Sequence, residues 1–183
     1  STRYGEDIYG KSMLPELLTA LCEIDGFKWI RTLYCYPERI TDELLDVIAK
    51  EDKLVKYLDM PIQHCDKTIL KRMNRRGDRE TLTALIKKIR EKIPNVTLRT
   101  TLITGFPGET KEQFEELCEF VKEIRFERLG CFAYSPEEGT PAEKFEDQVP
   151  LKDRERRAEI IMEEQMIISD SLNEAALDSE VEV

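Results

Sequence analysis

The chain has 183 residues, of which 40% are hydrophobic and 36% are charged. This composition is typical of a globular protein with one sizeable core, and it excludes a disordered chain. No apolar run is long enough to span a membrane and no secretory signal opens the chain, so we expect a cytoplasmic protein. Because the first residue is Ser1 and not Met, we also expect a piece of a longer protein.

The net charge of −10 is distributed unevenly along the chain. Residues 67–99 hold eleven lysines and arginines against three acidic residues, whereas residues 137–183 hold five against fifteen. An acidic chain is not typical of general nucleic-acid binding. The basic segment can face an anionic partner or can form a solvated helix surface, and the sequence leaves both open.

Five cysteines are scattered along the chain, with no Cys-x-x-Cys pair: Cys22, Cys35, Cys65, Cys118 and Cys131. An odd number without paired spacing indicates neither a zinc site nor a disulfide framework. We expect thiols in a reducing compartment.

Helix and strand patterns alternate throughout, with no internal repeat. We expect strands at 28–34, 54–62, 96–104 and 128–135. A helix after Ser12 precedes the first strand, and a helix capped by Thr41 follows it. A short helix capped by Asp66 and a helix ending near Ile93 follow the second strand, a helix with a Thr110–Gln113 capping box follows the third, and a long helix from about Leu151 follows the fourth.

This alternation predicts βαβ units and a parallel sheet, either open or closed into a barrel. Functional groups of such folds gather at the carboxyl ends of the strands. Four loops follow the predicted strands and are rich in Gly, Pro and polar residues: 34–39, 60–66, 104–110 and 134–141. We therefore expect one functional face built from these loops.

The loop at 104–110 joins a strand to a helix through a Gly-x-x-Gly pattern. Gly105 and Gly108 let backbone N–H groups approach a ligand, and the following helix adds a partial positive charge. The pattern lacks the Lys and Ser/Thr of a nucleotide-triphosphate loop, so a tight structural turn explains it equally well.

The other polar groups of the four loops do not define a catalytic site. His64 is the only histidine, and a hydrogen-bonded structural role is more typical of such a residue than catalysis. Glu137 and Glu138 are adjacent and point in different directions, which disfavours the paired acids of a glycosidase. No spacing predicts a nucleophile triad or a metal site.

Taken together and in order, five segments resemble the radical SAM methylthiotransferases, from Ser1 to about Gln165. The segments are "TRYG", "LYCYP", "PIQHCD", "LRTTLITGFPGET" and "YSPEEGTPA". "GFPGET" and "YS…GTPA" are shared with the branch that modifies tRNA. That branch typically has "PVQSGS" where this chain has "PIQHCD" and lacks the "LYCYP" form, so the branch that modifies a ribosomal protein is favoured.

The resemblance implies an incomplete (β/α)₆ TIM-like barrel and a radical enzyme. A [4Fe–4S] cluster on a Cys-x₃-Cys-x₂-Cys loop binds S-adenosylmethionine (SAM) in this family. The resulting radical abstracts hydrogen from the β-carbon of an aspartate in a small-subunit ribosomal protein. A second cluster supports sulfur insertion, and a C-terminal TRAM domain helps to bind the macromolecular substrate.

The departures from the family pattern are large. The chain has no Cys-x₃-Cys-x₂-Cys, which in the family lies upstream of "TRYG". We therefore expect residues 1–170 to form a partial core with barrel strands three to six, without metal ligands. Residues 171–183 are expected to be a linker into a missing TRAM domain, with "SEVEV" as its first strand. We expect this piece to be inactive alone.

The resemblance also implies a set of SAM-binding residues. Leu102, Ile103, Thr104 and Gly105 are expected beside the adenine, with Gly108 and Glu109 fixing the turn. Gln63 and His64 are expected near the ribose or the substrate. Further SAM and substrate-side candidates are Arg99 for the SAM carboxylate, Tyr4 and Gly5 near the SAM amino group, and Tyr36, Pro37, Tyr134 and Ser135 toward the substrate. Arg99 can equally make a structural salt bridge.

Two other functions stay open at this point. One is a tRNA methylthiotransferase, and the other is a catalytically silent module that binds a ligand or a protein. Because two barrel strands are expected to be absent, one sheet edge should be uncovered. Such an edge invites self-association or a covering segment.

Overall fold

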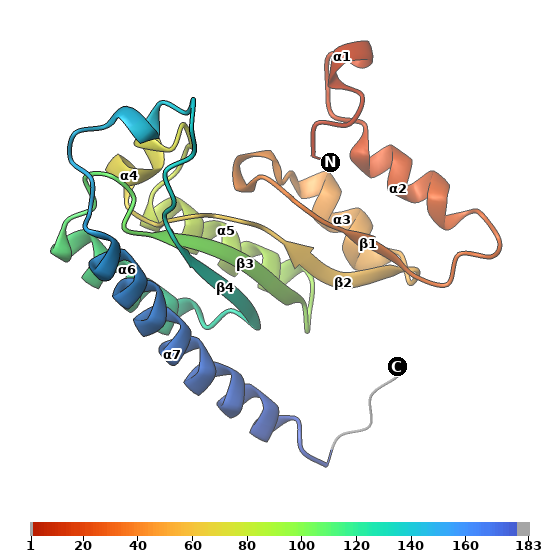
Figure 1. The fold of residues 1–183 in the computed structure, drawn as a ribbon. Coiled ribbons are helices and arrows are strands. Elements are labelled where there is room, and N and C mark those ends of the chain that lie inside the picture. Colours follow the sequence, from red (N-terminus) through yellow and green to blue (C-terminus); the bar gives the residue numbers. More distant parts are fainter. Residues whose placement is uncertain (1, 179–183) are drawn as a thin grey trace.

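The computed structural model describes residues 2–178, which form a four-stranded sheet with helices packed against it (Figure 1). All strands are parallel and adjacent in the order β1-β2-β3-β4. Their bounds are Ile30–Thr32 for β1, Leu54–Asp59 for β2, Thr97–Thr104 for β3 and Arg128–Ala133 for β4. The predicted parallel α/β architecture is confirmed.

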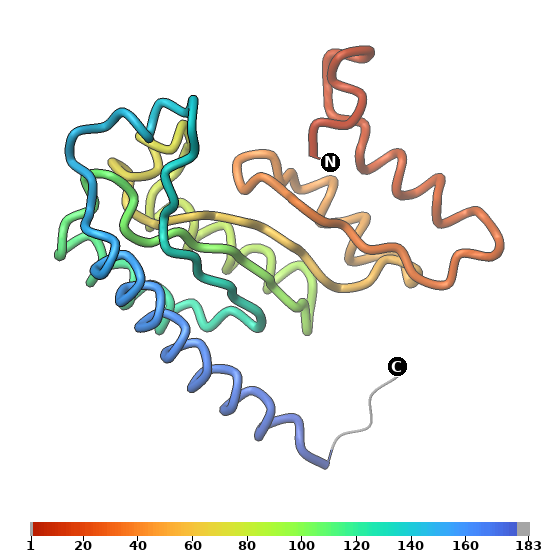
Figure 2. The backbone as a smooth tube through the Cα atoms, viewed as in Figure 1, coloured from red at the N-terminus to blue at the C-terminus, as the bar shows by residue number. Residues whose placement is uncertain are grey.

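Helices connect the strands, and further helices precede β1 and follow β4 in the chain. The helices are α1 (Glu6–Tyr9), α2 (Leu14–Cys22), α3 (Asp42–Lys50), α4 (Lys67–Arg72), α5 (Arg79–Lys92), α6 (Lys111–Ile124) and α7 (Leu151–Ala175), with single 3₁₀ turns η1 (Pro37–Arg39) and η2 (Ala142–Lys144). The chain trace places α2 beside α3 near β1, and α7 beside β4 and α6 at the opposite edge (Figure 2). Among residues 2–178, no helix combines the length and apolarity that a membrane crossing needs.

The helix starts follow from capping side chains that the sequence predicts. The Thr41 side chain accepts the N–H of Leu44, and the Asp66 carboxylate accepts two N–H groups at the start of α4. Thr110 and Gln113 cap α6 reciprocally. These bonds satisfy N–H groups that have no partner within the helix, and so they set where each helix leaves the functional face.

The two faces of the sheet have different environments, as β3 illustrates. Leu98 and Leu102 are buried in the main core, together with Leu58 of β2 and Ile161 of α7. The alternate residues, such as Thr101, are only half-buried and lie on the opposite, inner face. That face would be the interior of a closed barrel, and β1 and β4 are the two edge strands of the sheet in the described chain.

Each of the four predicted strands is longer than the one observed, and the difference is largest for the first two. The strand predicted at 28–34 extends only over Ile30–Thr32, because Tyr34 has a positive φ and turns the chain. The strand predicted at 54–62 ends at Asp59, and Gln63 then makes one isolated bridge to β3. The predicted strand at "SEVEV" lies outside the described residues.

Candidate functional site

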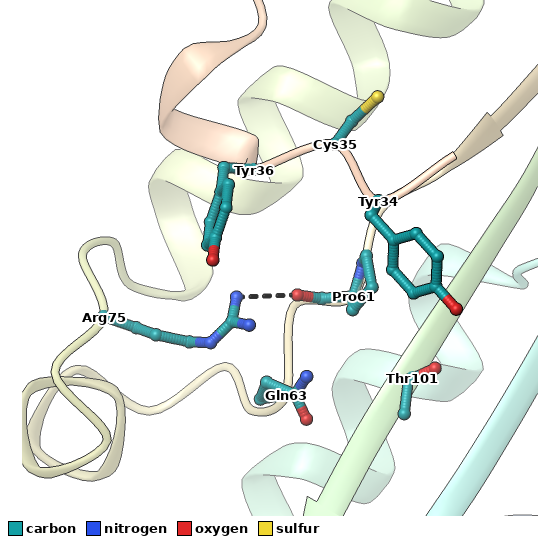
Figure 3. A pocket seen from close by; sticks show the side chains of 7 residues that line it. All are labelled: Tyr34, Cys35, Tyr36, Pro61, Gln63, Arg75 and Thr101. Atoms are coloured by element: carbon teal, nitrogen blue, oxygen red, sulfur yellow. Dashed lines mark hydrogen bonds between the residues drawn. The ribbon is translucent and has the colours of Figure 1, made fainter. Parts of the chain in front are cut away.

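A cavity of about 220 Å³ opens at the carboxyl ends of β1, β2 and β3 (Figure 3). It is lined by Tyr34, Cys35 and Tyr36 after β1, Pro61 and Gln63 after β2, Arg75 after α4, and Thr101 of β3. Two of the four predicted loops, 34–39 and 60–66, contribute to this lining, and two of the predicted site residues, Gln63 and Tyr36, line the cavity itself.

Arg75 supplies the positive charge of this cavity. Its Nη1 donates a 2.8 Å hydrogen bond to the Pro61 carbonyl, and its guanidinium lies 5.4 Å from the centre of the Tyr36 ring. No carboxylate within residues 2–178 lies at ion-pair distance from it, and burial lowers its pKa from the ordinary value. A half-buried guanidinium without a carboxylate is suited to bind an anion.

No sequence pattern distinguishes Arg75 from its neighbours. It belongs to the basic segment 67–99, in which most cations are paired with acids. Lys87 pairs with Glu91 of its own helix, and six others pair with acids elsewhere in the fold: Arg72, Arg79, Lys88, Arg90, Lys92 and Arg99. The charge excess of the segment was a signal for an anion site. Four cations of the segment have no such acidic partner among the described residues, and of these four only Arg75 lines the cavity: Lys67, Lys71, Arg75 and Arg76.

Gln63 is held on the cavity wall by its backbone. It has a positive φ of 71°, its N–H donates to the Thr101 carbonyl at 2.9 Å, and its carbonyl accepts the Ile103 N–H at 2.8 Å. Its side-chain Oε1 is buried and has no hydrogen-bond partner among the described residues. An amide oxygen in this condition can accept a hydroxyl or N–H of a ligand.

His64 points away from the cavity into a buried polar cluster. Its side chain is fully buried, and its Nδ1 accepts the backbone N–H of Asp66 at 2.9 Å. Neutral imidazole then carries its proton on Nε2, which lies 3.4 Å from Glu109 Oε2. In this geometry the His64 side chain belongs to the buried cluster and does not line the cavity.

Glu109 joins three elements through the same cluster. Its Oε2 accepts the Gly105 N–H at 2.9 Å, and its Oε1 accepts from Arg157 Nη1 of α7 at 2.6 Å. The Glu109 carboxylate is fully buried and the Arg157 side chain is 16% exposed. The turn-fixing role expected for Glu109 therefore extends to α7, which it ties to the ends of β2 and β3.

The two glycines of this turn make room for other parts of the protein. A Cβ on Gly105 would lie 2.1 Å from Cγ and 2.9 Å from Cα of Arg154 in α7. A Cβ on Gly108 would lie 2.6 Å from an oxygen of Asp147, and the Gly108 N–H donates to the Asp147 carbonyl. The close approach that the pattern predicts is thus made by protein atoms, on the side away from the cavity.

Neighbouring residues of β3 divide between the two faces of the sheet. Leu102 is buried in the main core, and the Thr104 hydroxyl donates to the Arg154 carbonyl at 3.3 Å. Ile103 lies on the inner face and packs against a second apolar cluster around Phe106 and Tyr134. Only Ile103 and Thr101 of this segment direct their side chains toward the side on which the cavity opens.

Arg99 has the second of its two expected roles, a structural salt bridge. Its Nη1 lies 2.8 Å from Oδ1 of Asp59, whose side chain is 3% exposed. The other carboxylate oxygen accepts the backbone N–H of Tyr34 at 3.3 Å. Arg99 does not line the cavity.

The remaining candidates do not line the cavity. The Thr2 hydroxyl accepts the N–H of Tyr36 at 3.4 Å, which brings Thr2 beside the cavity, whereas Tyr4, two residues further on, is exposed and Gly5 follows it. Pro37 lines a separate groove beside α5. Tyr134 packs edge-on against Phe106 with ring centres 5.1 Å apart, and Ser135 is exposed beyond it.

The residues present do not fit an iron–sulfur cluster. Within residues 2–178 there is no group of three or more His, Cys, Asp or Glu side chains placed to hold a metal ion. Burial raises the pKa of Cys65 and of Cys131 to about 12, and that of Cys118 to about 11. These thiols are therefore protonated at neutral pH.

We expect this protonation to slow alkylation. With iodoacetamide at pH 8, Cys65, Cys118 and Cys131 of the folded chain should react more than about 100-fold slower than a thiol of ordinary pKa, because only the thiolate attacks. Peptide mapping by mass spectrometry over time, with a urea-unfolded sample as control, measures the rates. Equal rates in the folded and unfolded chains would contradict this expectation.

Comparisons with known proteins agree with this architecture. Residues 4–121 match the family model described as the Radical SAM superfamily. The chain is 57% identical over 169 residues to the ribosomal protein uS12 methylthiotransferase RimO of Lachnoclostridium phytofermentans, covering 92% of this chain and 38% of that protein. The Clostridium tetani RimO is 51% identical, over 94% and 39% of the two chains. The chain thus spans about two-fifths of the length of these relatives.

Solved structures support the fold. Coproporphyrinogen III oxidase (HemN) of Escherichia coli superposes with a TM-score of 0.63 at 24% identity, covering 85% of this chain and 36% of HemN. The radical S-adenosylmethionine methyltransferase TsrM of Kitasatospora setae gives a TM-score of 0.52 at 17% identity, over 64% and 23%. At these identities the likeness concerns the fold alone.

Proposed function

Because the chain belongs to the radical SAM superfamily, we propose that it forms the wall that binds SAM and substrate in a ribosomal-protein methylthiotransferase. The support for this reaction is the 49–57% identity to enzymes named for methylthiolation of ribosomal protein uS12. The acceptor would be the β-carbon of an aspartate in that small-subunit protein.

The observation that carries the SAM part of this proposal is the chemistry of the cavity. SAM has a carboxylate, ribose hydroxyls and an apolar adenine face. Arg75 lacks a carboxylate partner in the described chain, and Gln63 Oε1 lacks a hydrogen-bond donor there. These two groups complement the carboxylate and the ribose, respectively. SAM supplies radical chemistry when it is bound at a reduced iron–sulfur cluster.

Of the other predicted residues, some would contact SAM or the groups that bind it, and the others would hold the binding residues in place. On the inner face, Ile103 can lie against the adenine, and Tyr36 stacks on the guanidinium of Arg75. Behind them, Leu102, Thr104, Gly105 and Gly108 fix the strand end against the core and α7. We propose Arg75 for the carboxylate in place of Arg99, which is committed to Asp59.

We further propose that the chain works as one part of a longer enzyme. Residues 1–170 would be the partial core, and residues 171–183 would lead into a TRAM domain. The sequence has no Cys-x₃-Cys-x₂-Cys, so the ligands of both [4Fe–4S] clusters would come from other segments of that enzyme. We expect the chain by itself to show no methylthiotransferase activity.

Mass spectrometry of ribosomal proteins tests the reaction. The longer enzyme is reconstituted with iron and sulfide without oxygen, reduced, and supplied with SAM, a sulfur source and the small-subunit protein. The proposal expects a methylthio group in place of one hydrogen on an aspartate. If the ribosomal protein stayed unmodified and a tRNA became methylthiolated, the chain would be assigned to the tRNA-modifying branch instead. No modification of either substrate by a cluster-loaded enzyme would refute the proposed function.

A further inference from the structure

We propose that Tyr34 contacts the substrate polypeptide and that the Asp59–Arg99 ion pair positions it for this contact. The inference rests on the proposed function, because it assigns the substrate side of the same cavity. It concerns a residue that neither the sequence patterns nor the comparisons assign. Three observations carry it: the backbone conformation of Tyr34, its exposure and its supports.

The backbone of Tyr34 is in an uncommon conformation. Its φ is 57°, in the left-handed region that side chains other than Gly, Asn and Asp rarely occupy. Gln63, the other side of the same cavity, has a φ of 71°. Two strained non-glycine residues from adjacent strand ends thus face one cavity, and such strain gathers at functional sites.

Packing gives no reason for a tyrosine at this position. The Tyr34 residue is 67% exposed, so its ring contributes little to the core. A glycine would adopt the same φ without steric cost. At Tyr34 the backbone is strained and the ring is open to solvent. A contact between the ring and a ligand explains why a bulky residue occupies this position.

The surroundings of Tyr34 hold this conformation in place. The carboxylate of Asp59 accepts the Tyr34 N–H at 3.3 Å, and the Asp59 carbonyl accepts the next N–H, that of Cys35, at 2.8 Å. The same carboxylate pairs with Arg99 at 2.8 Å. A buried carboxylate therefore helps to fix the peptide groups that aim Tyr34, and Arg99 holds the carboxylate.

The position of the ring indicates which ligand it meets. Figure 3 shows Tyr36 and Arg75 on one side of the cavity and Tyr34 beside Thr101 on the other. The Arg75 side carries the cation proposed for SAM. The Tyr34 side has an aromatic face and a phenol that can donate to a carboxylate or a peptide carbonyl. These groups suit a polypeptide segment that presents an acidic side chain.

Thermal unfolding of the 183-residue chain tests the strain. Tyr34→Gly should leave Tm unchanged or raise it by roughly 2–4 °C, because it removes the strained side chain without opening the core. Asn95→Gly is the matched control, since Asn95 has a φ of 60° and is exposed in the turn before β3, at the opposite end of the sheet. A clear fall of Tm in Tyr34→Gly alone would give Tyr34 a structural role and overturn the proposal.

Steady-state kinetics of the longer enzyme test the contact. Tyr34→Phe and Tyr34→Gly should lower kcat/KM for the ribosomal protein about tenfold or more, while the KM for SAM stays within about twofold. Asn95→Gly should leave both constants unchanged. Tyr34→Gly should lose at least as much as Tyr34→Phe, because it also removes the ring.

The outcomes separate this inference from the proposed function. A rise in the KM for SAM, or unchanged kinetics in both Tyr34 variants, would overturn the substrate-side assignment while methylthiolation by the wild type stands. An Asp59→Asn variant that lowers kcat/KM for the ribosomal protein like Tyr34→Phe would support the positioning pair. Absence of methylthiolation in the wild type itself would refute the proposed function instead.

Discussion

Replacement of Glu109 by glutamine is expected to destabilise the folded chain by about 3–5 kcal/mol. The carboxylate is fully buried, pairs with Arg157 and accepts the Gly105 N–H, and it lies 3.4 Å from Nε2 of His64. An amide cannot balance the guanidinium, so a positive charge is left in a largely buried position. Thermal unfolding should show a fall in Tm of roughly 6–20 °C.

Glu138→Gln is the matched control, since Glu138 is exposed in the loop after β4. That substitution should change stability by no more than about 0.5 kcal/mol. If Glu109→Gln behaved like Glu138→Gln, the buried cluster would not tie α7 to the ends of β2 and β3. Arg157→Gln should cost a comparable amount, because it leaves the same carboxylate without its cation.

Replacement of Gly105 by alanine is the second large expected effect, about 2–5 kcal/mol of destabilisation. The new Cβ would lie 2.1 Å from Arg154 Cγ and 2.9 Å from the Arg154 Cα, so side-chain rearrangement alone cannot relieve the overlap. The shift of α7 should break the bonds that Arg154 makes to Thr104 and to the Tyr134 carbonyl.

Gly10→Ala separates the steric overlap with Arg154 from the energetic cost of placing alanine in the left-handed backbone conformation. Gly10 has the same φ of 69°, and a Cβ added to it would have no neighbouring atom within 4 Å. It should therefore show the left-handed penalty alone, about 1–2 kcal/mol. Urea unfolding followed by circular dichroism measures both variants. Equal losses in the two would mean that α7 does not need the space at Gly105.

Patterns in the sequence were sufficient for the architecture. The caps at Thr41, Asp66 and Thr110 are local signals, and each of these helices begins where they predict. The strand ends were less predictable because Tyr34 and Gln63 have positive φ values without being glycines. Such turns are imposed by partners from other strands, here Asp59 and Thr101, which no local pattern reveals.

The sequence was sufficient to predict at which end of the sheet the site lies, but not which residues line it. The loops at the carboxyl ends of the strands do meet, since parallel strands bring their ends to one edge. Whether Leu102 or Ile103 faces the cavity depends on the register of β3. Arg75 could not be separated from the other basic residues, because its distinction is that it lines the cavity, which is a property of the folded chain.

Equilibrium binding of SAM to the longer enzyme tests the central claim most directly, with two matched arginine variants. Arg75→Gln should weaken binding about tenfold or more, because it removes the cation proposed for the SAM carboxylate. Arg99→Gln should change it less than about threefold, since Arg99 pairs with Asp59 and does not line the cavity. A large loss in Arg99→Gln with unchanged binding in Arg75→Gln would contradict the account.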